Sequence, residues 1–212
     1  MKAVIRLAGI VGAIGAAFAT SLTASASTAD HLIMAGSGAD AVFSTCPTLP
    51  VPGQVCTDTR IAFADQITRA DGSTSPGTTL SVDVFKYGMD SSGGFFFVSD
   101  TAGFGLASMS IDSRLTGASA SATFPVITCF ADGTCTDGTM TVSASWNGQG
   151  ELRHDVSNFH FSKGDLSGIS HFNGFLRSAS ANGTVNGSGL GDSLFADIFN
   201  VKSVDVLICH MC

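Results

Sequence analysis

The chain has few charged residues, and the charge that it lacks excludes two classes of partner. Only 13% of its 212 residues are charged, ten basic against seventeen acidic, and the formal net charge is −7. Proteins that bind nucleic acid or anionic membrane surfaces need clustered basic side chains to neutralise phosphates. We therefore expect neither nucleic acid nor an anionic membrane surface as a partner.

Glutamate, Trp and Tyr are also scarce. Glu151 is the only glutamate, and the chain contains one Trp and one Tyr against 16 Phe and 25 Gly. A glycosidase needs a pair of carboxyl groups, which here would be mostly aspartates such as Asp83, Asp112 or Asp155, and nothing in their spacing singles out a pair. The 44% hydrophobic content excludes disorder, because such a chain buries enough apolar surface to offset its ordering entropy.

The sequence motifs of common enzyme classes are missing as well. The chain contains no G-x-S-x-G, H-E-x-x-H, P-loop or EF-hand pattern. Ser170 adjoins His171, and Asp155 adjoins His154, but neighbours on a strand point to opposite faces and cannot act as nucleophile and base. The sequence favours a non-catalytic protein, with an enzyme as the alternative.

The first 26 residues have the pattern of an export signal. Lys2 and Arg6 precede an apolar run over residues 7–22, and Ala24-Ser25-Ala26 has the small-x-small pattern of a cleavage site. A transmembrane anchor is the alternative, but three glycines interrupt the run, which is shorter than about 18 clean apolar residues. We expect a signal peptide over 1–26 and a secreted, extracellular protein with no transmembrane segment after cleavage.

The mature chain then covers 27–212 as a single domain. Its 186 residues suit one domain or two small ones, of which we expect one, and loss of Lys2 and Arg6 changes the formal net charge from −7 to −9. Export to an oxidising compartment favours disulfides over free thiols.

The six cysteines form three close couples, which are Cys46 with Cys56, Cys129 with Cys135, and Cys209 with Cys212. The short spacings favour pairing within each couple, as a disulfide at the end of a hairpin. The couples are separated by 73 and 74 positions and have similar flanking residues. This spacing predicts a twofold internal repeat, over about 45–128 and 129–208, with chance similarity as the alternative.

Cys209-His210-Met211-Cys212 is also a C-x-x-C motif. Thiol redox chemistry and a soft-metal site on Cys209, His210 and Cys212 are the functional alternatives to a structural disulfide. The motif lies at the end of the chain with no helix after it, so we favour the disulfide.

Alternation of apolar and polar residues dominates the chain. Residues 80–85, 107–115 and 140–145 alternate with a period of two, and Gly-containing turn signals separate such runs. This pattern predicts an all-β fold, an antiparallel β-sandwich or barrel. Only residues 194–199, after Asp192-Ser193, have helical spacing, which predicts one short helix at most.

The run Phe95-Phe96-Phe97-Val98 is apolar at consecutive positions. Such a run predicts a central strand that is buried on both faces. The functional alternative is an exposed aromatic platform for stacking on sugars, although at most two of the three Phe would share a face.

Three histidines cluster in a predicted hairpin. If residues 163–168 form its loop, His160 lies opposite His171, close enough for two imidazoles to share a metal. His154 would complete a three-histidine site in a straight strand, but the parity of the apolar residues predicts a bulge or bend that turns His154 and His160 to different faces. A divalent metal on His154, His160 and His171 is therefore the alternative to a solvent-facing polar ladder, and we expect no cofactor.

Asn182-Gly183-Thr184 and Asn186-Gly187-Ser188 match the glycosylation sequon. Because Asn-Gly is first of all a turn signal, we favour turns at both positions.

Residues 146–150, 157–161 and 171–174 resemble segments of small secreted bacterial β-rich proteins. The resemblance covers roughly a third of the mature chain and implies an exported protein, with no catalytic or binding residue to transfer. Together with the preceding patterns, it suggests a secreted, disulfide-stapled, non-catalytic binding or structural module that acts on an extracellular ligand or surface component. The alternative is a secreted metal-binding or hydrolytic enzyme that uses His160 and His171.

Overall fold

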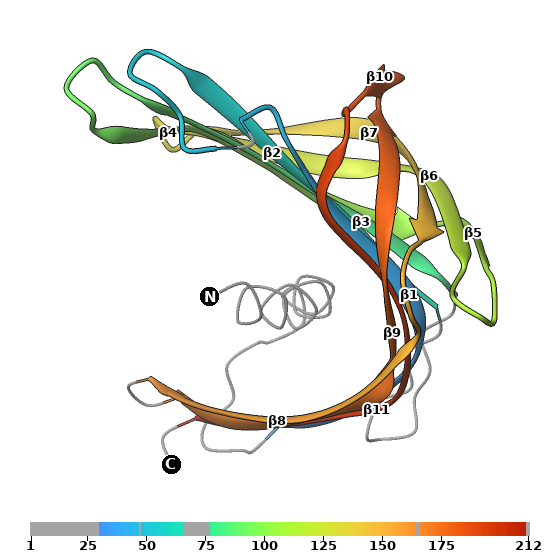
Figure 1. The fold of residues 1–212 in the computed structure, drawn as a ribbon. Helices are drawn as coiled ribbons and strands as arrows, with labels where there is room; N and C mark the ends of the chain where they lie inside the picture. Colours follow the sequence, from blue (N-terminus) through green and yellow to red (C-terminus); the bar gives the residue numbers. More distant parts are fainter. Residues whose placement is uncertain (1–29, 47, 66–76, 164–165, 211–212) are drawn as a thin grey trace.

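The computed structural model describes residues 30–46, 48–65, 77–163 and 166–210 (Figure 1). Every regular element in these ranges is a strand: β1 (Asp30–Ser44), β2 (Val55–Ala64), β3 (Thr79–Met89), β4 (Phe95–Leu106), β5 (Ser108–Ile111), β6 (Gly117–Phe130), β7 (Cys135–Gly148), β8 (Arg153–Lys163), β9 (Leu166–Val185), β10 (Ser188–Gly189) and β11 (Ser193–His210). Within the same ranges no helix is long and apolar enough to cross a membrane. The predicted signal peptide lies outside the described residues.

The strands form one antiparallel sheet whose two ends meet. Neighbouring strands follow the order β9, β11, β1, β2, β3, β4, β6 and β7. The ring closes because Val142–Gly148 of β7 pairs with Ala179–Val185 of β9. The predicted antiparallel all-β class is confirmed, and the closed sheet is a ring without the regular outline of a barrel.

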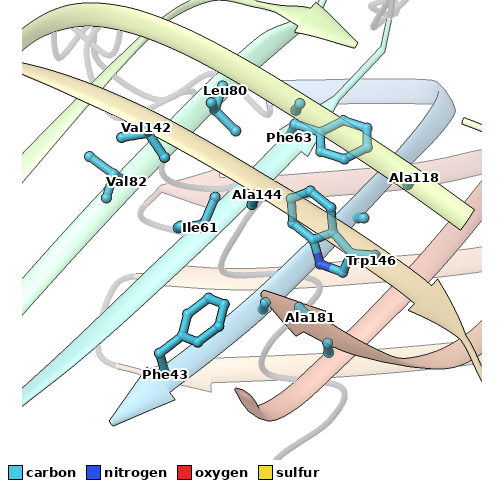
Figure 2. Packing of buried hydrophobic residues seen from close by; sticks show 14 of the residues in the cluster. Phe43, Ile61, Phe63, Leu80, Val82, Ala118, Val142, Ala144, Trp146 and Ala181 are labelled. Carbon is cyan, nitrogen blue, oxygen red and sulfur yellow. The ribbon is translucent and has the colours of Figure 1, made fainter. Parts of the chain in front are cut away.

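The predicted alternation explains the core. Leu80 and Val82 of β3 and Val142 of β7 point into the ring and are buried, while the residues between them point outward. Figure 2 shows these side chains packed with Ile61, Phe63 and others from facing strands. Each large side chain buried in this way contributes about 1.5–3 kcal/mol to stability.

Trp146 joins opposite walls of the ring. Its indole lies edge-to-face with the ring of Phe63, with 5.0 Å between centroids (Figure 2). Its Nε1–H donates to the carbonyl oxygen of Asp40 on β1 over 2.9 Å. The only Trp of the chain therefore has a structural role, 3% exposed in the core.

Three strands are longer than the ring requires. The first half of β9 and the second half of β11 continue past it, where they pair with each other, with β8 and with the start of β1. Figure 1 shows this part as a curved extension below the ring. β8 lies at the edge of this extension, since in the described part of the chain it pairs with β9 alone.

The prediction of a short helix over 194–199 is wrong. These residues lie in β11, which pairs with β1 on one side and β9 on the other. Ile198 points into the core and Phe199 is buried on the other face. Because this strand is buried on both faces, its apolar residues follow a pattern that resembles helical spacing. Hydrogen bonds to a neighbouring strand on each edge stabilise the strand over a helix.

The prediction that Phe95, Phe96 and Phe97 are core residues is also wrong. Their side chains are 61%, 41% and 37% exposed. They lie at the start of β4, directly after the turn at Asp90–Gly94, beyond the part of the sheet where β6 pairs with β4. A consecutive apolar run is buried on both faces only where other elements cover both, and here the strand extends past them.

Two of the predicted disulfides are present. Cys46 is bonded to Cys56 across the connection between β1 and β2, and Cys129 to Cys135 across the turn between β6 and β7. Both close hairpin ends, as the spacing predicts. The third couple ends at Cys212, which lies outside the described residues, and the internal repeat stays a prediction.

One of the two predicted Asn-Gly turns is confirmed. Asn186 and Gly187 both have positive φ angles, 50° and 80°, and form the tight turn between β9 and β10. Asn182 and Gly183 instead lie inside β9. A Cβ on Gly183 would lie 3.0 Å from the ring of Phe43, so close packing and not a turn requires this glycine.

Candidate functional site

The outer face of β2, β3 and β4 carries a group of neighbouring aromatic and charged side chains. Since Leu80 and Val82 point inward, the alternate residues of β3 point outward, and the register places Asp58 of β2 and Asp100 of β4 on either side of Phe85. We call this group the aromatic–carboxylate face, and its members are Asp58, Arg60, Asp83, Phe85, Tyr87, Phe97 and Asp100.

Its three aromatic rings form a stacked row. The centroid of Phe85 lies 5.5 Å from that of Tyr87 and 5.6 Å from that of Phe97, with interplanar angles of 28° and 30°. Phe85 is 42% exposed and Phe97 is 37% exposed. The row is therefore open to solvent, which is unusual for neighbouring large apolar side chains without a partner.

Asp58 is held beside this row by two hydroxyl groups. Ser44 Oγ donates to Asp58 Oδ1 over 2.5 Å, and the Tyr87 hydroxyl is hydrogen-bonded to the same carboxylate. Partial burial, followed by the negative charge of Asp58 and this hydrogen bond, raises the pKa of Tyr87. Asp58 therefore has a fixed position, with lone pairs left for a further donor.

Asp83 and Asp100 form a carboxyl pair on the other side of Phe85. Desolvation of Asp83 raises its pKa to about 6, and a hydrogen bond with Asp100 and the charge of Asp100 act in the same direction. Arg60, which lies opposite Asp83 on β2, partly offsets them. Since Asp83 keeps a large exposed surface, its carboxyl oxygens can accept hydrogen bonds from a ligand.

Arg60 also connects the face to a buried carboxyl group. Its Nη2 lies 3.2 Å from Oδ2 of Asp40, which is fully buried on β1 directly opposite Asp197 of β11. Burial raises the pKa of Asp40, and the charge of Arg60 lowers it by a smaller amount. The guanidinium of Arg60 therefore interacts with two carboxyl groups, those of Asp40 and Asp83. Its single positive charge does not balance the carboxyl groups around it, and the aromatic–carboxylate face stays acidic.

The three predicted metal ligands are placed on one hairpin, but in another register. Asn158, and not His160, lies opposite His171, and His160 lies opposite Ile169, so the prediction is wrong by two residues. The predicted bulge is also absent, because the register runs without a shift from Arg153 to Lys163. The loop is shorter than predicted, since β8 ends at Lys163 and β9 begins at Leu166.

Two of these histidines are hydrogen-bonded to amides. His154 Nε2 lies 2.9 Å from Oδ1 of Asn173, and His171 Nδ1 lies 2.5 Å from Oδ1 of Asn158. With an amide oxygen as acceptor, each of these nitrogens donates and has no lone pair for a metal. Within the described ranges, no three His, Cys, Asp or Glu side chains converge as metal ligands. A metal on His154, His160 and His171 stays a prediction.

A second surface feature is a shallow hollow of about 550 Å³ over β5, β6, β7 and β9. Its floor consists of two rows of short polar side chains on the outer face, Ser108, Ser121, Ser143 and Thr184, and Ser110, Ser119, Ser145 and Asn182. This surface is wettable and uncharged, but it lacks an aromatic or buried charged group that would select a ligand.

The sequence analysis names two members of the aromatic–carboxylate face as candidates, Asp83 as a possible glycosidase carboxylate and Phe97 within a possible sugar-stacking platform. The missed signal is the position of Phe85, an apolar residue in phase with Ser81 and Asp83 on the polar side of an alternating strand. Pairing of Asp83 with Asp100 could not be predicted, because it depends on the register between β3 and β4.

Comparison with protein-family models, with curated proteins and with solved structures finds no match to this chain.

Proposed function

We propose that this protein is a non-catalytic, extracellular binding module whose aromatic–carboxylate face binds a neutral polysaccharide chain. The observation that carries the proposal is the exposed stacked row of Phe85, Tyr87 and Phe97, flanked by carboxylates on both sides. The two disulfides are compatible with an extracellular protein.

The chemistry of the face suits a sugar ring. A pyranose presents apolar C–H groups on its faces and hydroxyl groups around its edge. Aromatic rings pack against the C–H groups, and ionised carboxylates accept hydrogen bonds from hydroxyls that are stronger than bonds between neutral groups. Phe85 supplies the first contact, and Asp58 opposite it on β2, together with the exposed carboxyl group of Asp83 on β3, supplies the second.

The arrangement of the rings favours an extended ligand over a small cation. Rings that enclose an ammonium group surround it as a cage, whereas Phe85, Tyr87 and Phe97 lie as a row with interplanar angles near 30°. A row on an open sheet face offers successive contacts to successive units of a polymer.

The Asp83–Asp100 pair supports binding over hydrolysis. Glycosidases separate their two carboxyl groups by about 5 Å or more, to leave room for the anomeric carbon or a water molecule. Asp83 and Asp100 are hydrogen-bonded to each other. They therefore lie too close together for the retaining or the inverting mechanism of glycosidases. The pair is therefore suited to holding hydroxyl groups of a ligand.

The proposal is tested by depletion of the purified protein from solution by insoluble cellulose, chitin, xylan and starch. We expect binding to at least one polymer and a two- to tenfold weaker affinity for Phe85→Ala, since aromatic contacts contribute about 0.5–1.5 kcal/mol each. Leu194→Ala is the matched control, because Leu194 is an apolar residue with 52% exposure outside the face. Melting temperatures of both variants exclude unfolding as the cause.

Two outcomes contradict the proposal. One is the absence of binding to all four neutral polymers. The other is binding to cationic chitosan alone, abolished by salt, because charge attraction to an acidic surface would then explain it without stacking.

A further inference from the structure

The outer edge of β8 is unpaired in the described part of the chain. β8 pairs with β9 along its whole length, from Arg153 to Lys163, and no described strand lies on its other side. An edge of this kind presents a row of backbone N–H and C=O groups that another strand can use. Prolines and bulges commonly block such pairing, but β8 has no proline and its register has no shift.

We propose that β8 pairs with β8 of a second copy of this chain, antiparallel and with Phe159 at the twofold axis. A twofold axis perpendicular to the sheet places each residue opposite its counterpart at equal distance from Phe159. Nine residues of each strand, 155–163, then lie opposite each other. The four-stranded extension becomes a continuous sheet that crosses both molecules.

Charge selects this register over its neighbour. Asp155 lies opposite Lys163 of the second copy, and the symmetry repeats this pair at the other end. A shift by two positions, with Asn158 at the axis, would place Arg153 opposite Lys163 twice. Opposite charges directly across a strand pair stabilise it and like charges destabilise it, so the first register is favoured.

The same register gives a partner in the second copy to two exposed polar residues of β8, Asn158 and His160. Asn158 already lies opposite His171 and bonds it through Oδ1. In the dimer, Asn158 also lies opposite His160 of the second copy, and both residues are exposed in the single chain. The His–Asn pairs of the hairpin thus continue across the interface, which gives His160 a partner of the same kind.

This proposal is tested by sedimentation equilibrium of the purified protein at increasing concentration, for three charge variants. Asp155→Lys and Lys163→Asp each place like charges opposite each other, and we expect the dimer dissociation constant to rise at least tenfold. The double variant restores opposite charges and is expected to return to the wild-type value. Asp192→Lys makes the same charge change at an exposed residue outside β8 and serves as the control.

A cross-linking experiment tests the register itself. Phe159→Cys is expected to form an intermolecular disulfide under mild oxidation, because directly opposite residues have Cα atoms about 4.5–5.5 Å apart. Ser157→Cys lies opposite Phe161 of the second copy and is expected to remain a monomer on non-reducing gels. A wild-type monomer at high micromolar concentration overturns the proposal. So does a dimer whose affinity is the same in both single charge variants.

Discussion

The carboxyl pair on the outer face gives the protein a measurable pH dependence. The pKa of Asp83 is raised from 3.8 to about 6, so the folded chain holds a proton that the unfolded chain releases at lower pH. The stabilisation is fully present below about pH 4 and is lost as the pH rises through about 6. Replacing Asp83 by Asn removes the titration but keeps a hydrogen-bond donor for Asp100.

The size of the effect follows from the shift and the exposure. The rise in the pKa of Asp83 from 3.8 to about 6 corresponds to at most about 3 kcal/mol in the free energy of unfolding. Because more than a third of Asp83 is exposed, solvent screening reduces this to about 1 kcal/mol. In a chain of this length, 1 kcal/mol corresponds to about 2–4 °C in melting temperature. We therefore expect Asp83→Asn to match the wild type at pH 4 and to be about 1 kcal/mol more stable at pH 7.

Urea unfolding measures this difference. Trp146 is the only Trp and is buried against Phe63, so its fluorescence reports loss of the core. Asp40 also has a raised pKa, but it contributes to both proteins and cancels in the comparison. Asp192→Asn, an exposed change of the same charge, measures the effect of net charge alone. Wild-type and Asp83→Asn stabilities that run parallel from pH 4 to 7 would refute the reasoning.

Three further predictions concern the ring. Trp146→Phe is expected to lower the free energy of unfolding by about 1 kcal/mol, because it removes the buried hydrogen bond to the β1 backbone, as measured by calorimetry. Replacing Cys46 and Cys56 by Ala is expected to lower it by about 2–3 kcal/mol, from loss of a short closed loop; unchanged urea midpoints would contradict this. Gly103→Ala is expected to destabilise by about 1–3 kcal/mol, since a Cβ would lie 2.5 Å from the Pro125 carbonyl oxygen, whereas Gly189→Ala, with open space around it, is the matched control in thermal melts.

Much of the fold could be predicted because alternation with a period of two is a local signal. The alternation over 80–85 and 140–145 predicts strands with one apolar face, and Leu80, Val82 and Val142 on that face are all buried. The disulfides at Cys46 and Cys129 follow from spacing in the same way. Closure of the ring between β7 and β9 could not be predicted, because it depends on pairing between segments about 40 residues apart.

The errors share one physical cause, which is that neighbours in space decide the meaning of a pattern. Phe95–Phe97 is exposed because β4 extends beyond its cover, and 194–199 is a strand because two strands pair with it. Gly183 lies inside a strand and not in the predicted turn, because the position needs a glycine for close packing against Phe43. The candidate face was missed for the same reason, since Phe85 gains its neighbours Asp58 and Asp100 only through strand register.

Amide chemical-shift mapping shows directly whether the aromatic–carboxylate face binds a neutral polysaccharide. The labelled protein is titrated with soluble hexasaccharides of cellulose, chitin, xylan and starch. We expect saturable shifts centred on Phe85, Tyr87, Phe97 and Asp100, and their loss in Phe85→Ala. Saturable shifts centred on the serine-lined hollow of Ser119 and Ser143, with the aromatic row unchanged, would contradict it.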